Sequence, residues 1–173
     1  MRAVSQRISY EVRMRTLLFC PLLFIRGFEL SFFREFGFSF IILCLEVFVL
    51  WYIRVLAETN RAPFDFVEGE SELVSGYNVE FGGFGFALIA LAEYGNILFM
   101  SLLTCVVFIS GLILWGVMGD FMLSVFVFFM SYRIIWVRGC FPRFRYDMLM
   151  AMCWKIILPL SLCMFLFYLF LGL

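Results

Sequence analysis

The sequence predicts an all-α membrane protein with about five transmembrane helices and a long acidic loop on the matrix side. Hydrophobic residues make up 65% of the 173 and charged residues only 15%, well below the roughly 25% of soluble domains. The apolar residues form continuous runs near the length of about 20 that a membrane-spanning helix needs. We therefore expect a single membrane unit, residues 1–173, with helices at about 8–25, 38–56, 84–110, 121–137 and 151–172.

The first expected helix, residues 8–25, is the most charged of the five. Glu11, Arg13 and Arg15 crowd its first half, and a charge at the centre of a membrane helix costs about 2.5–3.5 kcal/mol on insertion scales. Local pairing of Glu11 with the two arginines reduces that cost. By composition this segment is the weakest of the five candidates for a membrane span.

The next two expected helices contain isolated charges. Residues 38–56 are apolar except for Glu46 and Arg54, and the sequence identifies no partner for Glu46. Residues 84–110 belong to an apolar stretch longer than one span needs, with Glu93 inside it. Ionisable residues in a span are candidates for a proton or ion path. The alternative for Glu93 is a structural hydrogen bond or ion pair with another helix.

The last two expected helices carry one charge each. Residues 121–137 contain Arg133, and residues 151–172 contain Lys155 near their start. Pro159 is expected to kink the last helix, because proline removes a backbone donor. Both segments are apolar enough to cross a bilayer.

The distribution of arginines predicts the orientation. If all five segments span, the N-terminus, the acidic loop and the connection 133–145 share one side, opposite the loop 26–38 and the turn 119–120. The second side carries two arginines, and the first carries six: Arg2, Arg7, Arg61, Arg138, Arg143 and Arg145. Positive residues favour the non-translocated side, so the acidic loop faces the matrix or cytoplasm.

Carboxylates gather in the loop at residues 57–82. The loop holds one arginine, Arg61, and six acidic residues: Glu58, Asp65, Glu68, Glu70, Glu72 and Glu80. Like charges a few ångströms apart cannot all stay ionised, so such a cluster holds a variable number of protons, as a redox-coupled proton pump requires. A solvated loop without chemical function is the alternative. A calcium site is a third, although the spacing of an EF-hand is absent.

Apolar residues in this loop favour a segment folded against protein. Pro63 fixes a turn, and Phe64 and Phe66 place aromatic surface on either side of Asp65.

A short basic connection further along the chain contains Arg143, Arg145 and Asp147. It has two interpretations, contact with anionic lipid or docking of a soluble partner.

The cysteine and histidine content limits which metal and redox cofactors the chain can bind. The sequence has no histidine and no Cys-x-x-Cys motif, which excludes a bis-histidine haem, an iron–sulfur cluster and a thiolate zinc site. We expect the chain to bind no metal and no cofactor of its own. Six cysteines without paired spacing are interpreted as free thiols that pack as small hydrophobes: Cys20, Cys44, Cys105, Cys140, Cys153 and Cys163.

The loop motif A-E-T-N-R-A-P-F-D-F-V-E-G-E-S-E-L-V-S-G, residues 57–76, resembles the signature loop of subunit 1 of the proton-pumping NADH:ubiquinone oxidoreductase, respiratory complex I. The similarity extends along nearly the whole chain. Residues 3–12 resemble the start of the family's fourth transmembrane helix, residues 86–96 its sixth, and residues 142–155 the link into its eighth.

The resemblance implies a subunit that helps form the membrane entrance of the ubiquinone chamber and begins the acidic path that couples quinone reduction to proton translocation. It implies a quinone passage at Arg61, Phe64, Asp65 and Phe66. It implies a proton path at Glu11, Glu58, Glu68, Glu70, Glu72, Glu80 and Glu93. Ubiquinone is then the substrate of the complex, whereas NADH, flavin and iron–sulfur clusters belong to other subunits. The partners are other complex I subunits, including peripheral-arm subunits at the quinone site, and membrane lipid, with no nucleic acid.

The implied location is the mitochondrial inner membrane, and the 25 phenylalanines, which suggest T-rich codons, fit an organelle genome. The similarity begins at the family's fourth helix, so we expect a separate polypeptide with the first three helices to pack against residues 8–25. We also expect Glu11, Glu46 and Glu93 to face inward. Arg7 stands where the family usually has a small or neutral residue, and Glu46 belongs to no family motif.

Two functional classes remain open at this stage. The first is a coupling and quinone-site subunit of a redox-driven proton pump, which is not catalytic alone. The second is a membrane anchor or scaffold of a related hydrogenase-like or plastoquinone-linked complex, and a transporter or channel is a third possibility. The presence of three alternating loop carboxylates together with Glu93 favours the first class.

Overall fold

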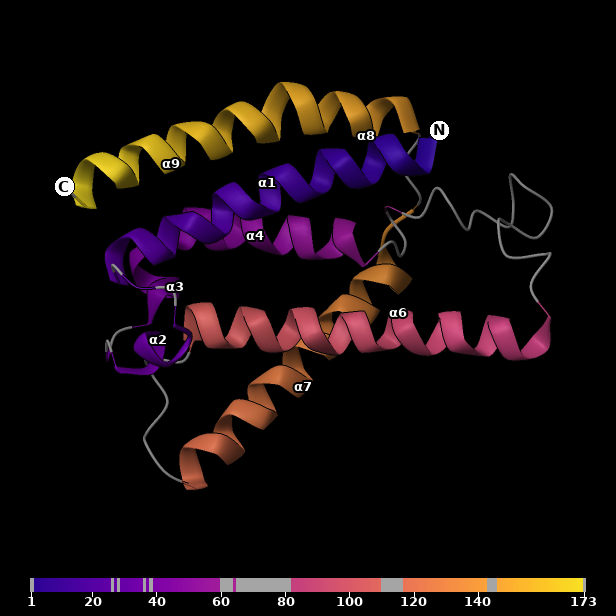
Figure 1. The fold of residues 1–173 in the computed structure, drawn as a ribbon, viewed down its shortest axis with the longest axis horizontal. Helices are drawn as coiled ribbons and strands as arrows, with labels where there is room; N and C mark the ends of the chain where they lie inside the picture. The colour runs from indigo at the N-terminus through magenta and orange to yellow at the C-terminus, as the bar shows by residue number, and fades with distance from the viewer. Residues whose placement is uncertain are drawn as a thin grey trace.

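The computed structural model describes residues 2–25, 27, 29–35, 37, 39–59, 64, 82–109, 117–142 and 146–172. Every regular element in these residues is a helix, and none is a strand (Figure 1). The predicted all-α class is therefore confirmed for the part of the chain that is described.

The first half of the chain forms two longer helices and two short ones. α1 covers Arg2–Ile25 and α4 covers Leu45–Glu58. Between them lie α2, Ser31–Glu35, and α3, Phe40–Leu43. The sequence predicts a loop at residues 26–38, whereas the structure forms α2 within it. A five-residue helix has too few residues for a periodic pattern to be recognised.

Cys44 interrupts the helix expected at residues 38–56. Its backbone, at φ −129° and ψ 50°, departs from helical values and separates α3 from α4. The hydrogen bonding nevertheless continues, because the Cys44 N–H donates to the Phe40 carbonyl at 2.8 Å and the Phe48 N–H donates to the Cys44 carbonyl at 3.0 Å. α3 and α4 thus follow each other with one irregular residue between them.

The second half contains the longer apolar helices. α6, Gly83–Thr104, continues into the π-helical segment η1, Cys105–Ile109. α7 covers Val117–Cys140. Together with their apolar composition, these lengths make both α6 and α7 suitable for crossing a bilayer.

The C-terminal part is one continuous run of helix with a π-helical turn inside it. α8, Tyr146–Met152, leads into η3, Cys153–Ile157, and then into α9, Leu158–Gly172. Pro159 is the second residue of α9, two positions after the end of η3. Since proline cannot donate a backbone N–H to the preceding turn, the irregularity expected at Pro159 takes the form of a wider π-helical turn before it.

Among the residues that the structure describes, three helices are long and apolar enough to cross a membrane: Gly83–Ile109, Met118–Cys140 and Asp147–Leu171. The apolar part of α1, Met14–Ile25, is shorter. α4 alone has 14 residues, and with α3 it reaches the roughly 28 Å that 19 helical residues cover.

The helices pack in two groups (Figure 1). α1 contacts both α4 and α9, and α6 contacts α7. η1 joins the groups through contacts with α2, α3 and α7. In Figure 1 the N-terminus, the end of α4, the start of α6 and α8 lie at one end of the molecule, which we call the loop end. The end of α1, α2 and the end of α6 lie at the opposite end.

Buried aromatic residues fix α4 against the far part of α6 and η1. The Trp51 indole N–H donates to the Thr104 hydroxyl oxygen at 3.0 Å. The Phe108 ring lies 5.3 Å from that of Phe48 and 6.1 Å from that of Trp51, measured between ring centroids. Aromatic pairs of this kind are worth about 0.5–1.5 kcal/mol beyond their buried area, so these contacts help to set the register between the two helices.

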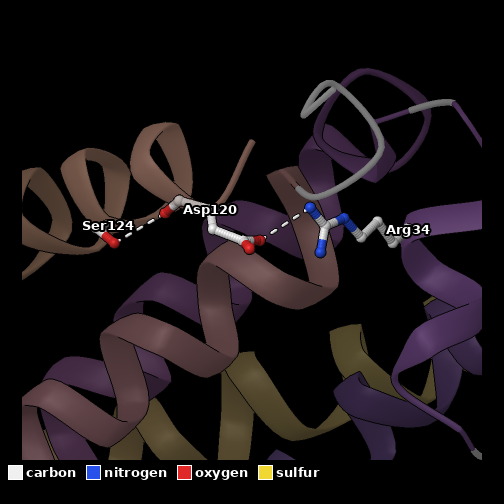
Figure 2. Close-up of polar contacts among 3 residues, drawn as sticks. All are labelled: Arg34, Asp120 and Ser124. Atoms are coloured by element: carbon white, nitrogen blue, oxygen red, sulfur yellow. Dashed lines mark hydrogen bonds and ion pairs between the residues drawn. The ribbon is translucent and has the colours of Figure 1, made fainter. Parts of the chain in front are cut away.

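An ion pair joins two segments far apart in the sequence at the opposite end. The Arg34 guanidinium donates to the Asp120 carboxylate at 2.9 Å, and the Ser124 hydroxyl donates to the Asp120 carbonyl at 2.8 Å (Figure 2). Arg34 belongs to α2 and Asp120 to the first turns of α7. The pair brings together the loop 26–38 and the turn 119–120, the two segments that the arginine pattern assigns to one side.

Candidate functional site

The C-terminal end of α4 leads directly into the acidic loop. Glu58, the last residue of α4, is half-buried, and Arg54 one turn earlier is only 1% exposed. Residues four apart share a helix face. A carboxylate is unfavourable at a helix C-terminus because of the helix dipole, and a cation on the same face offsets that effect. The chain thus places a buried positive charge beside the first acid of the loop.

Hydrogen bonds at Thr59 hold the end of α4. Its N–H donates to the Val55 carbonyl at 3.1 Å, and its hydroxyl donates to the Leu56 carbonyl at 3.0 Å. Thr59 itself is buried. These bonds satisfy carbonyls that a helix end would otherwise leave without partners, so the position of Glu58 is well defined.

Arg133 of α7 lies over the ring of Tyr52 in α4. The guanidinium carbon is 4.8 Å from the ring centroid, within the range of a cation–π interaction. Arg133 is half-buried. This contact accounts for a charge that the sequence showed only as an isolated residue in an apolar run, and it packs α7 against the middle of α4.

Glu93 is half-buried inside α6. α4 runs toward the loop end and α6 away from it (Figure 1), and the bond between Trp51 and Thr104 sets their register. Glu58 lies seven residues beyond Trp51, or about 10 Å, and Glu93 lies eleven residues before Thr104, or about 16 Å. The two acids therefore lie at depths that differ by about 6 Å, both toward the loop end.

Among the candidate quinone residues, the structure describes Phe64. Its side chain is 5% exposed and belongs to the hydrophobic core. The other candidates in the loop lie outside the described residues: Arg61, Asp65, Phe66, Glu68, Glu70, Glu72 and Glu80. The same holds for Arg143 and Arg145 of the basic connection, whereas Asp147 is exposed in the first turn of α8.

The expectation that three span acids face inward is wrong for two of them. Glu11 is exposed on α1, where the Arg15 guanidinium one turn later donates to its carboxylate. Glu46 is exposed in the first turn of α4. Since α4 buries Val47 and Trp51 against the rest of the chain, helical geometry turns Glu46 outward. Glu93 alone of the three is half-buried.

The interpretation of the cysteines as free thiols that pack as small hydrophobes is confirmed for four of the six. Cys20, Cys44, Cys105 and Cys153 are buried, while two are exposed, and all six are free thiols. Within the residues that the structure describes, no group of three His, Cys, Asp or Glu side chains could hold a metal ion.

Comparison with known sequences identifies the family. A sequence model of the family described as NADH dehydrogenase matches residues 1–169. This chain belongs to the NADH dehydrogenase family. Proteins named NADH-ubiquinone oxidoreductase chain 1 are among its relatives. The protein from Heterololigo bleekeri is 50% identical over 169 residues, which cover 95% of this chain and 54% of the relative.

Two further members of the NADH dehydrogenase family match this chain with similar identity and coverage. The relative from Aquarana catesbeiana is 46% identical over 171 residues, covering 97% of this chain and 52% of the relative. The one from Aedes aegypti is 49% identical over 164 residues, covering 94% and 51%. Both are named NADH-ubiquinone oxidoreductase chain 1. The chain spans about half the length of the curated relatives it matches.

Two contacts of this NADH dehydrogenase family member were not foreseen from the sequence. They are the ion pair between Arg34 and Asp120 and the stacking of Arg133 on Tyr52. Each links residues more than 80 positions apart. The signal that pointed to them was a lone charge within or next to an apolar run, since such charges are kept where they have a partner or a function.

Proposed function

We propose that this chain is a membrane subunit of NADH:ubiquinone oxidoreductase in the mitochondrial inner membrane. In that role it helps form the ubiquinone entrance and the acidic path that couples quinone reduction to proton translocation. The observation that carries the proposal is the end of α4, where buried Arg54 and half-buried Glu58 lead into a loop with five further carboxylates. Glu93 lies at a similar depth in α6.

Reduction of ubiquinone to ubiquinol takes two electrons and two protons. The electrons are supplied by flavin and iron–sulfur clusters of other subunits, and the protons reach the quinone through titratable side chains. On this chain we propose Arg61, Phe64, Asp65 and Phe66 for the quinone passage. We propose Glu58, Glu68, Glu70, Glu72, Glu80 and Glu93, with Glu11, for the acidic path.

A graded burial of these acids supports a path rather than a solvated patch. Glu11 is exposed, while Glu58 and Glu93 are half-buried. In a medium of low dielectric an acid exchanges its proton in response to nearby charge more strongly than it does in water. Glu93 lies inside an apolar helix, so we choose it for the test of the proposed path.

The proposed partners follow from the length of the relatives and from the exposed charges of α1. About half of the relatives' length is not represented in this chain. We propose that the helices of that half pack against α1, over the exposed pair Glu11 and Arg15, and that soluble subunits of the complex cover the acidic loop and the connection at Arg143, Arg145 and Asp147.

The test replaces Glu93 with glutamine in the assembled complex. Glu93→Gln keeps the shape and removes the titrating group. We expect NADH-driven quinone reduction and proton pumping to fall together, by roughly a hundred- to ten-thousandfold for loss of a proton-transfer group. Electron transfer from NADH to an artificial acceptor at the flavin should stay unchanged. The matched control is Glu35→Gln, an exposed acid at the opposite end, which should have native activity.

Two outcomes would contradict the proposal. Native pumping in an assembled Glu93→Gln complex would remove Glu93 from the path, and loss of assembly would assign it a structural role. Purification of the chain in mild detergent with a redox module that lacks flavin would favour the anchor or scaffold role in a related complex.

A further inference from the structure

The helices α3 and α4 bury one side and expose the other. The buried side consists of large apolar residues in contact with α1, α9 and η1, among them Phe40, Val47 and Trp51. The exposed side, which we call the outer face of α3–α4, consists of Ile42, Leu43, Leu45, Glu46 and Val49. Its four apolar members suit contact with lipid or with another helix equally well, so they do not decide what covers it.

The depth of Glu46 in the membrane indicates what covers the outer face of α3–α4. It lies twelve residues before Glu58, or about 18 Å along the helix, and six residues after Phe40, or about 9 Å. α3 and α4 together match the roughly 30 Å of the hydrocarbon layer, so both distances put Glu46 inside that layer. A carboxylate that faces lipid there is unfavourable.

No described residue supplies an ion-pair partner for Glu46. The ion pairs of Arg15 with Glu11 and of Arg34 with Asp120 join other side chains. Arg54 lies eight residues further along α4, about 12 Å away along the axis. The N-terminus of α4 provides a favourable partial charge, but a side chain exposed on the outer face needs a partner from outside the chain as described.

We propose that the outer face of α3–α4 binds a transmembrane helix that carries an arginine or lysine at the depth of Glu46. We assign this helix to the half of the relatives' length that this chain does not cover. Charge complementarity at Glu46 and an apolar surface on both sides of it fit such an occupant. The inference rests on the proposed role in an assembled complex, and it adds the site and the charge of one contact.

The test compares Glu46→Leu with Glu46→Gln in the assembled complex. Removing one partner of a buried ion pair leaves the other charge without compensation, so Glu46→Leu should reduce the amount of assembled complex by more than about tenfold. Glu46→Gln keeps a hydrogen-bond acceptor and should reduce it less. Val49→Leu, an apolar exchange on the same face, is the matched control and should assemble normally.

A lipid-facing Glu46 predicts the opposite sign, because leucine is more favourable than glutamate against hydrocarbon. Native or increased assembly of Glu46→Leu would therefore overturn the inference. A structure of the intact complex in lipid gives a second measurement, in which we expect a basic side chain within about 4 Å of the Glu46 carboxylate. Lipid at this position in a complex that still reduces quinone would refute this contact alone, whereas absence of NADH-driven quinone reduction would refute the proposed function.

Discussion

A buried hydrogen bond contributes to the register between α4 and α6, and its removal has a calculable effect. Trp51→Phe removes the indole N–H that donates to the Thr104 hydroxyl oxygen at 3.0 Å. The Thr104 hydroxyl still donates to the Met100 carbonyl at 2.7 Å, so Thr104 loses an accepted bond but keeps its own donated one. Hydrogen bonds between membrane helices average about 0.6 kcal/mol, with a maximum near 1.7.

Loss of the larger ring adds a packing term. Trp51 is 1% exposed and its ring lies 6.1 Å from that of Phe108, so the space left by the smaller side chain is fully buried. Partial relaxation of such a site leaves a cost of about 1–2 kcal/mol. The sum predicts that Trp51→Phe destabilises the packing of α4 on α6 by about 2 kcal/mol.

A double-mutant cycle separates the two terms. Thr104→Val removes the acceptor with little change in shape, and the double variant shows how strongly the two sites are coupled. We expect a coupling energy of about 0.6–1.7 kcal/mol between Trp51→Phe and Thr104→Val. The assay is the temperature or detergent concentration at which the assembled complex loses quinone reduction.

Ser101 provides the control for this cycle. It is buried on α6, and its hydroxyl donates to the Leu98 carbonyl of the same helix at 2.8 Å. Ser101→Ala should be additive with Trp51→Phe within about 0.3–0.5 kcal/mol. Equal additivity for Thr104→Val would show that the bond does not set the register.

Three other contacts give shorter predictions. Asp120→Arg should weaken assembly, and adding Arg34→Asp should restore it; the pair is worth at most about 1 kcal/mol, because the Asp120 side chain is 69% exposed. Tyr52→Leu should lower heat stability and Tyr52→Phe should not, since the cation–π contact with Arg133 needs the ring alone; equal losses would exclude that contact. Protease cleavage within residues 68–72 should appear only after soluble subunits are stripped from the complex.

The helical class and the apolar spans follow from the sequence, because long apolar runs leave no other way to satisfy the backbone in lipid. The runs that became α6, α7 and α9 lie where the hydropathy predicts them. Smaller departures from a regular α-helix do not follow from the sequence. The break at Cys44 changes the backbone angles of one residue, and the π-helical turn η3 shifts the hydrogen bonding by one residue. No periodic pattern records changes of that size.

The candidate site shows the same division. Glu58 and Glu93 were identifiable because an acid in or beside an apolar run is costly. The outward direction of Glu46 could not be predicted from the sequence. It depends on which face of α4 contacts the rest of the chain, and residues distant in the sequence decide that. Tyr52 was missed for the same reason, since its significance comes from Arg133 on another helix.

Three contacts hold the middle of α4: Phe48 against Phe108, Trp51 on Thr104, and Tyr52 under Arg133. They come from η1, α6 and α7, so any shift of α4 along its axis would break all three at once. Closely packed side chains resist such displacement. A change of charge at Glu58, which the proposed function requires, is therefore expected to be accommodated by side-chain rearrangement at the end of α4, while the helix itself stays in place.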